Sequence, residues 1–149
     1  MKTSRLILAL LLVGCALITP ALASDDWSNY KADNFLVNIP PDVKCKVSPR
    51  CDFVIYDFTR RGRPWLSVYK GNAPDFPSKQ PVEPIGSSEK INGISVKVET
   101  RYYQNHVKVS REYLFSQSGS KPSLHVWYNV LSGLELTQAE KSIHSIVLK

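Results

Sequence analysis

The sequence predicts an α+β fold, with an antiparallel sheet of about six strands and a C-terminal helix packed on one face. Short segments rich in aromatic and β-branched residues recur between clusters of turn residues, as they do in strands. Residues 94–103 alternate apolar and polar side chains with the period of two that a half-buried strand requires. Near the end of the chain the period becomes helical.

The N-terminus, residues 1–23, is predicted to be a cleavable signal peptide, which leaves a single domain over residues 24–149. Two basic residues precede an apolar run from Leu6 to Ile18, and Ala21-Leu22-Ala23 places small residues where a signal peptidase reads them. The apolar run, about 13 residues, is shorter than the roughly 20 that a membrane-spanning helix needs. We therefore expect a periplasmic or secreted protein, cleaved after Ala23.

A lipoprotein is the alternative for this N-terminus. Leu12-Val13-Gly14-Cys15 resembles a lipobox, in which Cys15 would carry the lipid. The chain stays apolar after Cys15, and the preceding apolar stretch is short, so cleavage at Ala23 is the preferred interpretation.

The net charge indicates the class of partner. Formal charge is +6 for the whole chain, and removal of Lys2 and Arg5 with the signal peptide reduces it to +4. Outside the cytoplasm, a modest positive charge favours an acidic protein or an anionic envelope surface and makes nucleic acid a poor candidate.

Cys45 and Cys51 are the cysteines that remain after cleavage, and in an oxidising compartment they are predicted to form a disulfide. Closing so short a loop stabilises a fold by about 2–2.5 kcal/mol at most, so the bridge would mainly shape the loop. The five intervening residues exclude a C-x-x-C redox motif.

The first half of the chain contains three predicted strands, at residues 35–39, 51–58 and 65–70. The second and third are expected to form a hairpin through the turn at residues 60–63. Residues 24–31 are interpreted as an arm leading into the fold, and residues 71–84, rich in proline, as a long irregular loop.

In the second half, Asn92-Gly93 is a strong hairpin turn between a short strand, 87–91, and the long strand 94–103. A second turn at Gln104-Asn105 would pair the long strand with residues 106–115. This register sets Ile94 opposite Phe115 and Lys97 opposite Glu112. It also leaves Arg111 on the buried face opposite Val98, where a bulge or an unidentified partner must accommodate it.

The chain ends in a predicted strand at residues 124–130 and a helix of about 10 residues. Thr137-Gln138-Ala139-Glu140 has the form of a capping box, so the helix is expected to begin at Thr137. Ala139, Ile143 and Ile146 would form its buried face.

Two segments resemble the small PsbP-like α/β/α sandwich domains of exported bacterial proteins. Phe35-Leu36-Val37-Asn38-Ile39-Pro40 is similar to their F-x-(L/V)-x-(I/L)-P opening, and residues 139–148 are similar to their last helix and tail. Residues 69–77 resemble a motif of uncharacterised exported proteins. The resemblance implies a non-catalytic accessory or binding role and transfers no site residue.

No catalytic, metal or cofactor motif is recognisable in the sequence. There is no G-x-S-x-G, and the three histidines, His106, His125 and His144, lack the spacing of metal ligands. Asp52 and Asp57 lie on opposite faces of one predicted strand, so they cannot act as a pair. The sequence thus predicts neither an enzyme nor a cofactor.

Basic residues gather at two places, the cysteine loop and the turn at 60–63, which we expect at opposite ends of one strand. The predicted partner-binding residues are Lys44, Lys46, Pro49, Arg50, Arg60, Arg61, Arg63 and Phe76. The leading hypothesis is a non-enzymatic binding module of the bacterial envelope that acts through protein–protein contact. The alternative is an inhibitor or immunity protein that blocks a secreted hydrolase toxin with the bridged loop 45–51, since a pre-organised loop loses little entropy on binding.

Overall fold

The computed structural model describes residues 26–71, 82–117 and 121–149. Strands account for 64% of the structure and helix for 11%, in two antiparallel sheets with one C-terminal helix. The α+β prediction is therefore wrong, and the fold is mostly β and sandwich-like. The predicted signal peptide and Phe76 lie outside the described residues.

The elements follow one another as ten strands and a helix inserted before the last strand. They are β1 (Ser28–Lys31), β2 (Phe35–Ile39), β3 (Val43–Pro49), β4 (Phe53–Arg60), β5 (Arg63–Gly71), β6 (Ile85–Ile91), β7 (Ile94–Tyr103), β8 (Lys108–Gln117), β9 (Lys121–Leu131), α1 (Gly133–His144) and β10 (Val147–Leu148).

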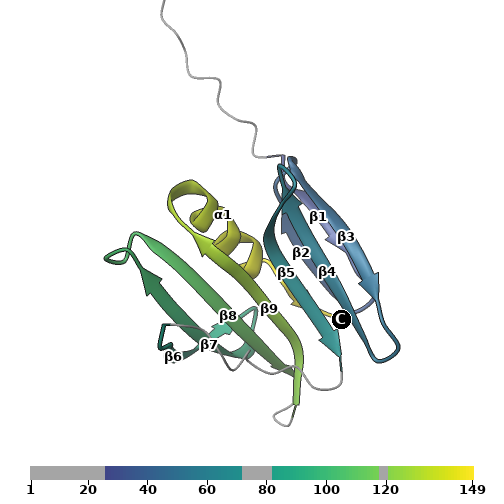
Figure 1. Ribbon diagram of the computed structural model, residues 1–149. Helices are drawn as coiled ribbons and strands as arrows, with labels where there is room; N and C mark the ends of the chain where they lie inside the picture. The colour runs from purple at the N-terminus through teal and green to yellow at the C-terminus, as the bar shows by residue number, and fades with distance from the viewer. Residues whose placement is uncertain (1–25, 72–81, 118–120) are drawn as a thin grey trace, which may run out of the picture.

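Seven strands form the larger sheet in the order β3-β4-β5-β9-β8-β7-β6, and three form the smaller sheet in the order β1-β2-β10. Figure 1 shows α1 beside β9 and the smaller sheet behind the β3–β5 end of the larger one. The helix and the smaller sheet together cover one face of the larger sheet, and the core lies between these layers.

The smaller sheet is the main difference from the prediction. Residues 28–31, interpreted as a polar arm, pair with β2, and Val147–Leu148 pairs with the other side of β2. Tyr30 of β1 packs edge-on against Phe58, at 5.1 Å between ring centroids. Both β1 and β10 are short, and each pairs with one edge of β2.

The hairpin between β4 and β5 confirms one local prediction. Arg61 and Gly62 have φ values of +50° and +73°, which is the left-handed pair of a two-residue hairpin turn. Asn92 and Gly93, at +49° and +82°, form the same kind of turn between β6 and β7. Each turn brings together the two strands that its sequence predicted.

The register of β7 with β8 differs from the prediction by two residues. The turn spans residues 104–107, and Val96, not Ile94, lies opposite Phe115. A shift by two preserves which side chains face the core. It changes the cross-strand neighbours, so that Glu112 lies opposite Glu99 and Arg111 opposite Thr100.

Helix α1 begins four residues before the predicted start, at Gly133 after the N-cap Ser132. Thr137 lies within the helix, where its hydroxyl donates to the Gly133 carbonyl oxygen at 3.3 Å. The predicted buried face is confirmed for Ala139 and Ile143, whereas Ile146, also buried, lies beyond the end of the helix at His144.

Candidate functional site

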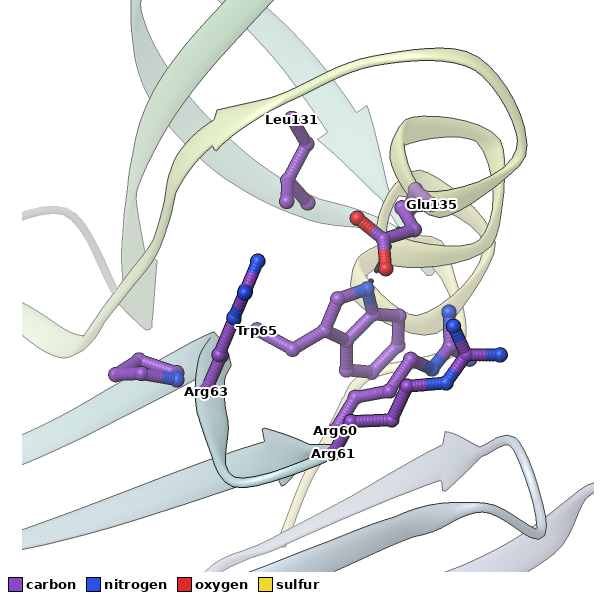
Figure 2. Close-up of a pocket in the computed structure, with 7 residues that line it drawn as sticks. Arg60, Arg61, Arg63, Trp65, Leu131 and Glu135 are labelled. Atoms are coloured by element: carbon purple, nitrogen blue, oxygen red, sulfur yellow. Dashed lines mark hydrogen bonds between the residues drawn. The ribbon is translucent and has the colours of Figure 1, made fainter.

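A pocket of about 360 Å³ lies at the β4–β5 turn, beside the start of α1. Figure 2 shows the indole of Trp65 in its centre, with Arg63 on one side toward Leu131 and Arg60 and Arg61 on the other. Its lining residues are Arg60, Arg61, Arg63, Pro64, Trp65, Leu131 and Glu135. Three of the predicted partner-binding arginines are thus brought together around an aromatic wall.

The position of Trp65 results from an irregularity in the hairpin. The register of β4 with β5 shifts between Phe58 and Thr59, which gives β5 one extra residue. As a result, Trp65 and Leu66, which are adjacent in sequence, are both buried. The Trp65 indole N–H also donates to the Glu135 carbonyl oxygen at 3.4 Å, a long bond that joins β5 to the first turn of α1.

Arg60 is a structural member of this pocket. Its guanidinium forms an ion pair with Asp42, with Nε 3.0 Å from Oδ2 and Nη2 donating to Oδ1 at 3.1 Å, and Nη1 donates to Gln138 Oε1 at 2.7 Å. It also lies over the Trp65 ring, 4.9 Å from the centroid. With its side chain only 8% exposed and these partners in place, Arg60 fixes the pocket wall and has little capacity for a ligand.

Arg61 and Arg63 are exposed, and neither side chain makes a hydrogen bond or ion pair with another described residue. Asp42 neutralises Arg60, and Glu135 is the only acidic residue among those that line the pocket. Arg61, Arg63 and Glu135 together therefore leave the pocket with one net positive charge. Leu134, beside Glu135, is 71% exposed. The pocket therefore offers guanidinium groups next to an apolar wall, which suits a carboxylate carried on an apolar or extended chain.

The other predicted binding residues do not belong to this pocket. Lys44 and Lys46 lie on β3, opposite Thr59 and Asp57, so the segment predicted as a loop is an edge strand. Arg50 is exposed at the far end of the β3–β4 hairpin, beyond Pro49. The lysines thus run along the sheet edge from the pocket end, whereas the prediction placed them with Arg50 at the opposite end.

Both cysteines are present as thiols, Cys45 half-buried and Cys51 exposed. Cys45 lies opposite Phe58 within β3, and Cys51 lies in the hairpin turn beyond Pro49. Cys45 and Pro49 are four residue steps apart along the strand, or about 13 Å, whereas bridged cysteines need Cα atoms within roughly 7 Å. The disulfide thus stays a prediction that would require β3 to separate from β4.

A carboxylate on α1 pairs with Arg111, which lies on the face predicted to be buried but keeps a side chain 32% exposed. Arg111 forms an ion pair with Glu140 at 3.0 Å and donates from Nε to Thr100 at 3.1 Å. The hydroxyl groups of Tyr113 and Tyr128 also donate to Glu140, the first at 2.6 Å. Burial, together with the charge of Glu140, raises the pKa of both tyrosines well above its ordinary value. Both predicted explanations are therefore found, because Arg111 has a partner on the helix and the register of β8 with β9 shifts between Val109 and Arg111.

A second buried charged cluster lies on the opposite face of the larger sheet. Arg101 binds Glu112 at 2.8 Å and Glu99 at 3.0 Å, and His125 Nε2 lies 3.1 Å from Glu112. Arg101 and Glu112 are each 4% exposed. The shift in the β7–β8 register brings these residues together, and the predicted pair of Lys97 with Glu112 is not formed.

The remaining histidines do not gather with other potential metal ligands. Across the described ranges, no group of three His, Cys, Asp or Glu side chains could hold a metal ion. His144 and His106 are both exposed, and His144 lies 3.5 Å from Glu89.

Sequence reasoning missed the residues that give the pocket its shape. Asp42, Glu135 and Gln138 belong to no motif that the sequence reveals. Only a weak signal in the sequence could have identified Asp42: it is a single acidic residue between Pro40-Pro41 and the lysines of β3. Gln138 and Glu135 become relevant only when α1 packs beside the β4–β5 turn.

No helix in the described part of the chain has the length and apolar character needed to cross a bilayer. A comparison with protein-family models and with curated proteins found no match to this chain. The PsbP-like resemblance therefore remains a prediction.

Proposed function

We propose that this domain is a non-enzymatic binding module of the bacterial envelope, which takes an acidic segment of a protein partner into the Arg–Trp pocket. The observation that carries the proposal is the pair of exposed guanidinium groups, Arg61 and Arg63, on either side of a fixed indole. The envelope location rests on the predicted signal peptide.

The pocket is pre-organised for binding. Arg60 is held by Asp42 and Gln138, and it in turn covers Trp65. Side chains already fixed in the free protein lose little conformational entropy when a partner docks. Arginine and tryptophan are also the residue types that dominate the energy of protein interfaces.

The backbone at Arg61 supports the same interpretation. A left-handed conformation costs a residue with a Cβ atom roughly 1–2 kcal/mol, and asparagine or glycine would fit the turn better. Unfavourable backbone conformations concentrate at functional sites. The exposed side chain of Arg61 at this position is consistent with a role in contacting a partner.

The test is affinity capture from envelope extract with two matched double variants. We expect Arg61→Glu with Arg63→Glu to abolish capture of the partner, and Lys46→Glu with Arg50→Glu, an equal charge change elsewhere, to leave it intact. Close interfacial charge pairs contribute about 1.5–7 kcal/mol, so the pocket variant should weaken binding at least tenfold in a titration with the captured partner.

Equal capture by wild type and the pocket variant would refute the proposal. A peptide of alternating glutamate and leucine provides a defined probe, because its binding should change the fluorescence of Trp65 in the wild type and not in the pocket variant.

The inhibitor or immunity function is a second candidate, and the exposed β3–β4 hairpin tip favours it. Arg50, Cys51 and Asp52 project at the end of this hairpin, in the form of a short loop that could enter an active-site cleft. Loss of capture in the Lys46→Glu, Arg50→Glu variant alone would support this candidate in place of the first.

A further inference from the structure

Strand β6 is the last strand at one end of the larger sheet, and its outer edge has no partner strand among the described residues. Six of its seven residues are exposed, and only Ile91 is buried. We infer that this edge pairs antiparallel with the β6 edge of a second copy of the chain, about a two-fold axis at Ser88. This inference is independent of the proposed function, because the Arg–Trp pocket lies on other strands.

The hairpin geometry identifies the backbone groups available for pairing. Asn92-Gly93 joins Ile91 to Ile94, and the residues that close a two-residue turn are a hydrogen-bonded pair. Bonded and non-bonded pairs then alternate along the ladder, so the odd-numbered residues bond to β7. Gly86, Ser88 and Lys90 consequently direct their N–H and C=O groups outward.

The opposite edge of the same sheet lacks these properties. The Arg50 N–H donates to the Phe53 carbonyl oxygen at 2.8 Å, which by the same alternation directs the odd residues of β3 outward. One of these is Pro49, which has no N–H to donate. Self-pairing would also bring Lys44 and Lys46 close to the same lysines of another copy. Lysine and proline are common protections of edge strands; the outward positions of β6 include no proline and a single lysine, Lys90.

The two-fold axis at Ser88 gives a register without like charges opposite one another. Ser88 faces the partner's Ser88, and Gly86 faces the partner's Lys90, twice over by symmetry. On the other face, Glu89 lies opposite the partner's Ser87. The edge of β6 is therefore self-complementary in this register.

Gly86 has no explanation within the chain. Its φ lies outside the left-handed region, and a Cβ atom added to it would meet no atom within 4 Å. Glycine inside a strand weakens the strand and often marks the close approach of another chain. Around it is a hollow of about 350 Å³, lined by Gly86, Ser87, Ser88, Lys97, Val98 and Glu99.

The hollow gives the partner's Lys90 a counter-charge. Gly86 pairs with Glu99 on β7, so Glu99, Gly86 and the partner's Lys90 lie in one row across the joined sheet. Two strand spacings separate the ends of this row by about 10 Å, which the side chains of a lysine and a glutamate span together. Arg101 bonds Oε2 of Glu99, and Oε1 has no bond to a described residue. Because Gly86 has no side chain, the lysine can cross it.

Sedimentation velocity tests the β6–β6 pairing, with protein purified after expression of the full chain, including its predicted signal peptide. An edge-strand interface is small and therefore weak, so the concentration series should extend from about 10 μM to 1 mM. We expect the sedimentation coefficient of the wild type to rise with concentration. Ser88→Pro, which removes an outward N–H, should abolish this rise, and Ser88→Ala should retain it.

Two further variants test the register and guard against misfolding of Ser88→Pro. Gly86→Val should fill the hollow and weaken association at least fivefold, with an unchanged circular dichroism spectrum. Lys90→Glu should weaken it similarly, and the added Glu99→Lys should restore it. A wild type that stays monomeric at about 1 mM, or a Ser88→Pro variant that associates like wild type, would overturn the inference. Arg61→Glu with Arg63→Glu should leave self-association unchanged, which separates this result from the proposed function.

Discussion

Replacement of Glu140 by alanine should destabilise the protein severely, and the structure gives the magnitude. The Glu140 carboxylate accepts the hydroxyl groups of Tyr113 and Tyr128 and pairs with Arg111. The two tyrosines are 0% and 2% exposed, so water cannot readily replace the lost acceptor. Hydrogen bonds to a charged group contribute about 1.5–3 kcal/mol each, which gives about 3–6 kcal/mol for the pair. The half-exposed Arg111 adds little, because partly solvated ion pairs contribute about 0–1 kcal/mol.

A loss of this size is a large part of the roughly 5–15 kcal/mol by which domains are stable. Helix propensity cannot account for it, because alanine is the better helix former. With an m value of about 2 kcal/mol/M, a loss of about 3 kcal/mol lowers the urea midpoint by about 1.5 M. Urea unfolding followed by circular dichroism measures the shift, and Glu135→Ala, on the exposed side of α1, should change stability by less than about 1 kcal/mol.

Replacement of the two tyrosines tests whether their unpaired hydroxyl groups cause the loss of stability. If unpaired hydroxyl groups cause the loss, Tyr113→Phe with Tyr128→Phe in the Glu140→Ala background should recover about 1–3 kcal/mol. A Glu140→Ala variant within about 1 kcal/mol of wild type would show that the cluster is not a major contribution to stability. A triple variant no more stable than Glu140→Ala would refute the argument from unsatisfied hydroxyl groups.

Three further outcomes are expected. Because the pKa values of Tyr113 and Tyr128 are raised in the folded protein, their hydroxyl protons dissociate at lower pH in the unfolded chain than in the folded one. Above about pH 10, the free energy of unfolding should therefore fall by about 1.4 kcal/mol per pH unit for each of the two tyrosines. Urea titrations across that range measure the slope, and the two Phe replacements should reduce it without abolishing it, because burial also raises the pKa values of Tyr30 and Tyr56. Burial raises the pKa of the Cys45 thiol, so at about pH 8 iodoacetamide should modify the exposed Cys51 at least tenfold faster than Cys45. Mass spectrometry follows the modification of both thiols. Protection of both thiols until reductant is added would indicate the predicted disulfide instead. Arg61→Asn should raise stability by about 0.5–1 kcal/mol in urea unfolding, since asparagine tolerates the left-handed turn, and it should reduce capture of the partner. If stability does not rise, the left-handed backbone of Arg61 does not carry the proposed energetic cost.

Tight turns and side-chain periodicity were readable from the sequence because they depend on neighbouring residues. Asn92-Gly93 and Arg61-Gly62 form the hairpin turns that were predicted, and the buried face of the helix was correct. The alternation along β7 also identified the core side of that strand. In each case the information lies within a few residues of the element that it predicts.

The segment that includes Cys45 and Cys51 shows how a plausible local rule can fail. Spacing favoured a bridged loop, yet Val43, Cys45 and Val47 also alternate with Lys44, Lys46 and Ser48 in the pattern of a strand. Pairing with β4 selects the second interpretation in this structure. The choice depends on a neighbouring strand, so the segment alone does not determine it.

By itself, the sequence determined the local elements: which residues turn, which strands form tight hairpins and which helical residues are apolar. Tertiary structure decided how many sheets exist, which register joins β7 to β8 and which carboxylates meet Arg60, Arg111 and Arg101. The physical reason is that an arginine on one strand can be neutralised by any acidic residue that the fold brings within hydrogen-bond distance. Asp42, Glu140 and Glu112 acquire that role only when the strands and the helix have packed.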